Sequence, residues 1–391
     1  MGSFQLTIRP RSGAGEQIVN GGQTGADRAA STRRLTRCSR SRYKCLMKGF
    51  ASRVDLPHWF RFMDTNRKRW RRLVVLCFCL SSVTWLAAQD ANWKHEIRLA
   101  IRSNDVAKVA AILSSNSLPP GVTLDDNSVT PLHLASLMGS SEVASWLLGK
   151  GAPVDAATAE QGHTPLIIAA GRGHVEVAEL LLQHSAKIDQ KDSAGLTPLL
   201  WAIHQDQTAM AEYLIRRGAD VNATANIGRS ALMMAAEKGS VPLVTELIAK
   251  GANSNHTNEA GNDALIEAAE AGHADAVRVL LQKGGATNRQ NAEGWTGLMK
   301  AAALGHLDVV KALCEAGADQ SKKNKFGRTA MDYAKGIPGT TALKTGEDLD
   351  KAVEKKVFSS EELYYVMARK RSDIDYGAIV KLLGEYSQRP K

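Results

Sequence analysis

Short apolar stretches at helical spacing recur along residues 92–334, and glycine-containing turns separate them. Each unit begins with a Thr-Pro-Leu-like tripeptide, continues through two short helical patterns and ends at a Gly-Ala-Asp-like turn. Successive units start 34 or 33 residues apart, at Thr130, Thr164, Thr197, Ser230, Asp263, Thr296 and Thr329. A fixed period of this length predicts stacked repeating units that share one continuous core.

The polar residues at the unit starts predict where the first helix of each unit begins. Thr, Ser and Asp are good N-caps because a side-chain oxygen can accept a hydrogen bond from a free helix N–H, and proline fits the next position. Left-handed turns are expected to end these helices at Gly139, Gly173, Gly239, Gly272 and Gly305, with Asp206 replacing glycine in one unit. The pattern therefore predicts an all-α fold of stacked helix–turn–helix units with hairpin-like loops.

The units resemble ankyrin repeats. Residues Thr130–Ala135 (TPLHLA) and Arg217–Ala223 (RGADVNA) nearly match the repeat consensus, and the resemblance covers about residues 92–334. It implies a solenoid that binds another protein through a concave surface of loops and first helices. Only the first unit keeps the consensus histidine, so apolar packing is expected at its replacements: Ile167, Leu200, Met233, Ile266 and Met299, followed by Asp332.

Composition and repeat pattern together divide the chain into six segments. An insertion of about forty residues separates the last repeat from its expected second helix, and a helix is expected after Ser359, where Glu362 completes a capping box. The segments are a spurious or disordered leader (1–62), a signal segment (63–88), an N-terminal capping repeat (92–126), ankyrin repeats (127–334), the insertion (335–372), and a capping helix with tail (373–391).

Residues 63–88 have the layout of a secretory signal peptide. A basic stretch follows Met63, an apolar core runs over Leu73–Leu86, and small residues follow it. Cleavage is expected after Ala88 or Gln89, which would make the array a periplasmic or secreted protein. An uncleaved signal anchor is the alternative, and it places the array on the same non-cytoplasmic side of a membrane.

A signal peptide normally starts a chain, so Met63 is interpreted as the true initiator and residues 1–62 as an artefact. Residues 17–30 (QIVNGGQTGADRAA) resemble a fragment of the molybdenum-carrier family, which places a glycine-rich loop at a phosphate. The resemblance stops after Ala30, where a basic stretch without apolar period follows. A strand and loop with no sheet to join bury no core, so no function is expected of this fragment.

The positive charge of the chain does not indicate nucleic-acid binding by the repeats. Residues 1–88 carry 17 Lys and Arg against 4 Asp and Glu, whereas residues 89–391 carry 33 against 36. Cys314 is the one cysteine after residue 89, which excludes a disulfide within the array and a cysteine-built zinc site there. Cys314 is expected to be a core residue.

In ankyrin repeats, partners usually contact loop tips and exposed positions late in the first helix. Carried onto this sequence, these positions give the predicted partner-binding residues. Among them Leu196 and Trp295 stand out as apolar anchors at exposed positions, although Trp295 could instead pack over the next loop. The predicted set is Leu196, His204, Gln205, Ile227, Arg229, Glu237, Lys238, Glu259, Asn262, Glu270, Glu293, Trp295 and Leu304.

The remaining polar residues of the array favour structural roles. His174, His273 and His306 follow turn glycines at the repeat spacing, which is not the spacing of metal ligands. Glu267 and Lys300 occupy a first-helix position that is apolar in most units, and they are expected to be solvated. The array contains no Ser-His-Asp set, P-loop or HExxH motif.

The sequence therefore predicts a monomeric binding scaffold that is not an enzyme and carries no cofactor or metal. Its partner is expected to be a protein, with no nucleic acid. Two alternatives stay open: a membrane-anchored accessory or regulatory subunit with an uncleaved signal segment, and, ranked last, an enzyme that uses the 335–372 insertion.

Overall fold

The computed structural model describes residues 92–336, 364–365 and 374–388. The predicted leader and signal segment, and all of the insertion except residues 335–336 and 364–365, lie outside these ranges, as does most of the helix expected after Ser359. Within the described ranges the chain is helical, and an isolated bridge between Thr224 and Ser230 is its one β-type pairing. The all-α repeat fold predicted from the sequence is confirmed for this part of the chain.

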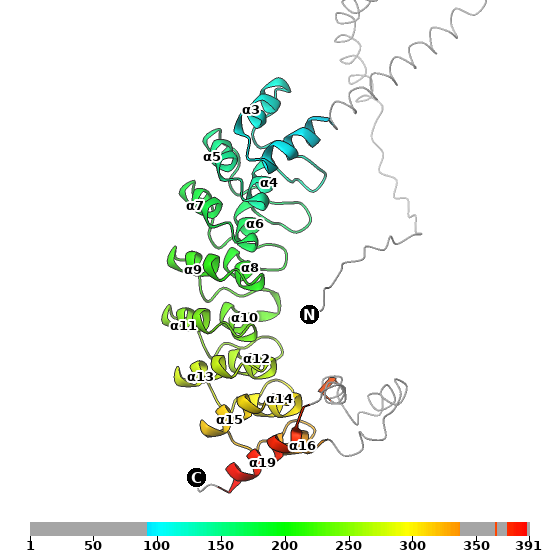
Figure 1. Ribbon diagram of the computed structural model, residues 1–391, viewed down its shortest axis with the longest axis vertical. Helices are drawn as coiled ribbons and strands as arrows, with labels where there is room; N and C mark the ends of the chain where they lie inside the picture. The colour runs from blue at the N-terminus through cyan, green and yellow to red at the C-terminus, as the bar shows by residue number, and fades with distance from the viewer. Residues whose placement is uncertain (1–91, 337–363, 366–373, 389–391) are drawn as a thin grey trace, which may run out of the picture. The chain divides into compact units, whose positions relative to one another are not determined.

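The helices form two parallel rows, with the loops projecting beyond the row of first helices (Figure 1). The stack begins with a helix over residues 92–102 and α3 (Val106–Ser115). The first helices are α4 (Pro131–Met138), α6 (Pro165–Arg172), α8 (Pro198–His204), α10 (Ala231–Glu237), α12 (Ala264–Ala271), α14 (Gly297–Leu304) and α16 (Ala330–Lys335). The second helices are α5 (Ser141–Gly149), α7 (Val175–Gln183), α9 (Thr208–Arg216), α11 (Val241–Ala249), α13 (Ala274–Gln282), α15 (Leu307–Glu315) and α19 (Tyr376–Ser387).

The predicted caps set the start of every first helix. At all seven starts the side chain of the Thr, Ser or Asp accepts a hydrogen bond from the backbone N–H three residues later. Asp332, which replaces the consensus histidine of the last repeat, also reaches back to the backbone N–H of Thr329 and completes a capping box. These short helices therefore begin at positions that the local sequence determines.

Histidines pack over the turns that end the preceding first helices. Gly139 and Gly272 are left-handed, and a Cβ at either position would lie 2.7 or 2.8 Å from the ring of His174 or His306. The Nε2 of His306 donates a hydrogen bond to the carbonyl of Glu270 at 3.0 Å, and burial lowers the pKa of His306. Glycine is thus required at these turns by both backbone conformation and space, and the histidines are structural, as predicted.

The loops are joined to one another as well as to their own helices. From one loop to the next, a backbone N–H donates to a carbonyl one repeat earlier, as from Asn226 to Ala194 and from Glu259 to Ile227. Beneath this ladder, the apolar faces of both helix rows form one buried cluster that runs from Trp93 to Leu383. Cys314 belongs to that cluster, as predicted. The helix α19 packs against α15 and α16, where it takes the place of a second helix.

The expectation that Trp295 is an exposed anchor is wrong. Its side chain is 0% exposed and stacks on Tyr333, with ring centroids 4.4 Å apart, and contacts Tyr365 at 4.7 Å. Tyr333 belongs to the next repeat and Tyr365 to the insertion. Two aromatic rings from later parts of the chain therefore cover a position that the repeat pattern alone leaves open. Leu196, the second expected anchor, is half-buried and packs against the core.

Trp295→Ala should destabilise the C-terminal part of the array by about 3–5 kcal/mol, since it removes a large aromatic side chain from a packed cluster. The exposed side chain of Ile227, which is 58% accessible, supplies the control, because Ile227→Ala should change the free energy of unfolding by no more than about 0.5 kcal/mol. Urea unfolding of the full chain, followed by circular dichroism, measures both. Equal free energies of unfolding for the Trp295→Ala and Ile227→Ala variants would show that Trp295 is a surface residue.

Candidate functional site

The face formed by the first helices and the loops before them is the candidate functional surface, and we refer to it as the first-helix face. Three positions of each repeat form rows along it: the residue before the helix cap, and the fourth and seventh residues after the cap. The fourth-position row runs Leu134, Ile168, Trp201, Met234, Glu267, Lys300 and Tyr333. The seventh-position row runs Leu137, Gly171, His204, Glu237, Glu270, Ala303 and Gly336.

A polar loop residue connects each of several loops to this face. The side-chain oxygens of Asp192, Asn291 and Asn324 each accept hydrogen bonds from backbone N–H groups two and four residues later, which closes the loop. Asn324 also donates from its side-chain nitrogen to the hydroxyl of Tyr333, nine residues later, at 2.6 Å. Loop conformation and first-helix side chains are therefore fixed together.

In the third repeat, Trp201 is held in a similar way, by a hydrogen bond between its side chain and a polar loop residue. Its Nε1 donates to the Oδ2 of Asp192 at 2.7 Å, and Asp192 is itself buried. The rings of His163 and His204 meet the indole edge-on, with centroids 5.2 and 5.7 Å away. His163 Nε2 also lies 3.5 Å from Asp192 Oδ2. Trp201 is only half-buried, so this fixed indole remains accessible to a partner.

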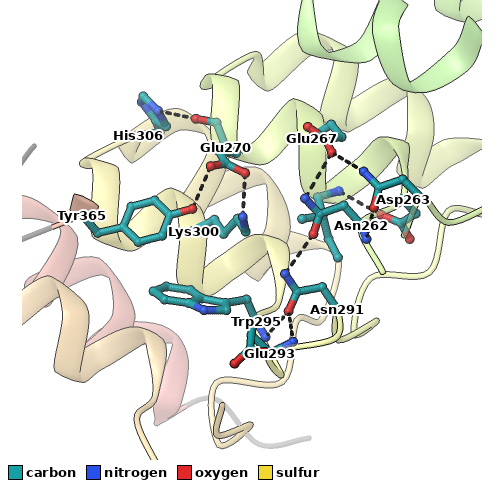
Figure 2. A network of polar contacts seen from close by, with 12 residues as sticks. Asn262, Asp263, Glu267, Glu270, Asn291, Glu293, Trp295, Lys300, His306 and Tyr365 are labelled. Atoms are coloured by element: carbon teal, nitrogen blue, oxygen red, sulfur yellow. Dashed lines mark hydrogen bonds and ion pairs between the residues drawn. The ribbon is translucent and has the colours of Figure 1, made fainter. Parts of the chain in front are cut away.

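The fifth and sixth repeats carry a polar network on the same face (Figure 2). Glu267 Oε1 accepts hydrogen bonds from the side-chain amides of Asn258 and Asn262, both at 3.1 Å. Asn291 donates to the side-chain oxygen of Asn262 at 2.9 Å, which links one repeat to the next. Asn262, a predicted partner-binding residue, is therefore buried in internal hydrogen bonds and is not available to a partner.

Lys300 is buried, contrary to the solvated position expected for it. Its Nζ lies 2.6 Å from Glu270 Oε2, and the side chain is 3% exposed. The hydroxyl of Tyr365 donates to the other oxygen of Glu270 at 2.7 Å, and its ring lies 5.6 Å from Nζ. The ring of Tyr365 covers the buried ammonium group, and Glu270 compensates its charge. This end of the first-helix face is covered by the chain itself.

Asp263 combines a cap with a buried ion pair. Its Oδ1 accepts from the N–H of Ile266 at 2.9 Å, and its Oδ2 lies 2.9 Å from Arg289 Nε. Burial raises the pKa of Asp263, while the Ile266 N–H and the Arg289 guanidinium act in the opposite direction. The pair joins a first-helix start to the next repeat, which makes it a structural element.

The predicted partner-binding residues fall into three groups. Asn262 and Trp295 are buried. Six are half-buried, namely Leu196, Arg229, Glu237, Glu270, Glu293 and Leu304. Five are exposed, namely His204, Gln205, Ile227, Lys238 and Glu259. The repeat-based prediction missed Trp201; pairing each polar loop residue with the helix residue nine positions later would have found it.

Among residues 92–336, 364–365 and 374–388, no group of three or more His, Cys, Asp or Glu side chains is placed to hold a metal ion. No helix within 92–336 or 374–388 is long and apolar enough to span a bilayer.

Glu267→Gln should stabilise the array at pH 7 and have little effect at pH 4. Burial, with Glu270 and Glu237 nearby, raises the pKa of Glu267, although Asn262 and Lys300 partly oppose the shift. Ionisation is therefore harder in the folded chain, so the wild type loses stability as pH rises from the ordinary glutamate value through the raised one. The glutamine side chain of the variant keeps an oxygen acceptor and removes this loss.

Melting temperatures of the wild type and Glu267→Gln at pH 4 and pH 7 measure this difference. Glu259→Gln is the matched control, since Glu259 is exposed and its substitution should leave the pH dependence unchanged. A lower melting temperature for Glu267→Gln at pH 7 would show that the ionised carboxylate is stabilising.

Comparisons with known proteins agree with this geometry. A family model described as ankyrin repeats (3 copies) matches residues 153–225, 222–291 and 284–337, and a model described as ankyrin repeats (many copies) matches residues 97–148. No match to a curated protein was found.

Similar solved structures include two ankyrin domains. The human ASB11 ankyrin repeat domain is 25% identical, with 54% of this chain and 93% of that chain covered and a TM-score of 0.49. The ankyrin repeat domain of Bcl-3, described as a unique member of the IkappaB protein family, is 26% identical, with 55% and 97% covered and a TM-score of 0.49. Because the family models match more than half of its 391 residues, this protein belongs to the ankyrin-repeat family.

Proposed function

We propose that the chain is an exported scaffold that recognises a protein partner through the first-helix face of its first four repeats. Ankyrin repeats generally mediate protein–protein interactions and are typically non-enzymatic. The observation that carries the location is Trp201, an accessible indole held rigidly by Asp192. A fixed aromatic side chain loses little conformational entropy on binding, which makes it an effective interface anchor.

The distribution of exposed side chains supports the same half of the face. His204, Gln205 and Lys238 are exposed there, and the exposed Ile227 lies at a loop tip nearby. In the fifth to seventh repeats, by contrast, the corresponding side chains are engaged with one another or with Tyr365. A partner that approaches the C-terminal repeats would have to displace these internal contacts, whereas the first four repeats offer the accessible indole of Trp201 and the exposed side chains of His204 and Gln205.

Ile227 adds a second feature to this half. Its backbone φ is +62°, a conformation that is strained for a β-branched residue. The 3-10 turn η1 (Asn226–Gly228) presents this exposed apolar side chain at the tip of the fourth loop. Strained residues of this kind are concentrated at functional positions.

Export is proposed from the sequence of residues 63–88. The basic stretch, the apolar core Leu73–Leu86 and the small residues after it match a signal peptide. The proposal places the array in the periplasm or outside the cell, without catalysis and without a cofactor. The second candidate, favoured by the same apolar core if it stays uncleaved, is a membrane-anchored accessory subunit.

Site-specific photocrosslinking tests the proposed face. p-Benzoylphenylalanine placed at His204 should crosslink the full-length chain to one protein in cells that produce it naturally. The same group at Glu179, an exposed residue of the second-helix row, should not. Equal crosslinking at Glu179, or crosslinking there alone, would contradict binding through the first-helix face.

N-terminal sequencing of the protein from separated cell fractions tests export. The proposal predicts a start at Gln89 or Asp90 in the soluble non-cytoplasmic fraction. A start at Met63 in the membrane fraction would support the anchored subunit instead. A cytoplasmic protein that starts at Met1 would overturn both.

A further inference from the structure

A hollow of about 300 Å³ opens on the first-helix face beside Trp201. Leu137, Ile168 and the indole of Trp201 contribute its apolar surfaces, and Arg172 and Gln205 also line it. Its volume lies at the low end of the range for ligand pockets and suits one bulky side chain. Since Trp201 is fixed by Asp192, this apolar surface is already in place before anything binds.

The hollow exists because Gly171 has no side chain. The neighbouring repeats place Leu137 and His204 at the equivalent helix position. The backbone of Gly171 is not in the left-handed region, and an added Cβ would lie 3.6 Å from Trp201 Cε3 and 3.8 Å from Gln205 Cγ, which are ordinary contact distances. Neither backbone conformation nor space requires glycine at position 171, and glycine is a poor helix former. The local structure therefore gives no reason for a glycine here.

The charge beside the hollow is positive and uncompensated. Arg172 is exposed, and no carboxylate among the described residues pairs with it. Other cations of the same face are paired: Arg229 with Glu237, Lys238 with Asp206, and Lys300 with Glu270. The nearby Asp192 is buried and already accepts hydrogen bonds from Trp201 and its own loop.

We propose that the hollow at Gly171 receives a bulky apolar side chain of a partner polypeptide, and that an Asp or Glu adjacent to it in the partner pairs with Arg172. This inference rests on the proposed function and specifies the chemistry of the partner. The apolar side chain supplies most of the affinity, because burial of an aromatic or leucine side chain outweighs an exposed ion pair. The Asp or Glu of the partner then provides specificity, because apolar segments without an adjacent acid cannot pair with Arg172.

A phage-displayed library of random 12-residue peptides, selected on the full-length chain, provides the probe. The enriched peptides should share an aromatic residue or leucine next to Asp or Glu. Synthetic copies should bind Gly171→Leu at least about ten-fold more weakly than wild type, because the introduced side chain fills the hollow. Arg172→Glu should weaken them by up to about five-fold and favour peptides with Lys in place of the acid.

Gly149→Leu is the matched control. Gly149 is also a helical glycine, at the end of α5 in the second-helix row, and an added Cβ would meet nothing within 4 Å. Both leucine variants should melt no lower than wild type, since leucine is the better helix former, and only Gly171→Leu should lose the peptides. Gly171→Ala, whose Cβ fits, should bind with intermediate affinity even if leucine disturbs the fold.

Wild-type affinity in both Gly171 variants would overturn the inference. If His204→Glu then abolishes binding, the peptides bind the first-helix face outside the hollow. The proposed binding surface then stands, and only the inference about the hollow is wrong. If neither position affects the peptides, or if no peptide is enriched, the hollow and the proposed face are both overturned.

Discussion

Contact between neighbouring repeats is the interaction on which the rest of the structure depends. No helix pair within the described part of the chain has a complete core of its own, because its two helices pack on each other and also on the pairs before and after them, in one continuous buried cluster. The contact is repeated at three levels: apolar faces in the helix rows, histidines over turn glycines, and backbone hydrogen bonds between loops. Because these contacts repeat, most polar groups of the stack have a structural role. A polar group that departs from the pattern is therefore a candidate for function.

The stack also determines which surface side chains remain available. Some side chains of the first-helix face pair with their own loop, as Trp201 does with Asp192, and others join a network across repeats, as Glu267 does through Asn262 and Asn291. Toward the C-terminus the networks become denser, and Trp295, Lys300 and Tyr365 close the face with internal contacts. The division into an open and an occupied half therefore follows from packing, and it locates the proposed binding surface.

The features that the sequence predicted correctly are local ones. Caps, turn glycines and the apolar stripe depend on residues within about four positions, so the pattern around Thr130 or Gly139 was sufficient. Trp295 was misjudged because the rings that cover it, those of Tyr333 and Tyr365, come from the next repeat and from beyond the start of an insertion. Lys300 was misjudged for the same reason. Gly171 was visible as a glycine between Leu137 and His204 at the equivalent positions of the neighbouring repeats, but its effect on the surface required coordinates.

Hydrogen–deuterium exchange of the full chain, with and without its natural partner, tests the central claim most directly. The account predicts that the partner protects backbone amides in the loops and first helices between residues 127 and 238. It also predicts unchanged exchange in the second-helix row and in residues 262–336. Protection concentrated in either of those two regions would contradict the division of the first-helix face into an open and an occupied half.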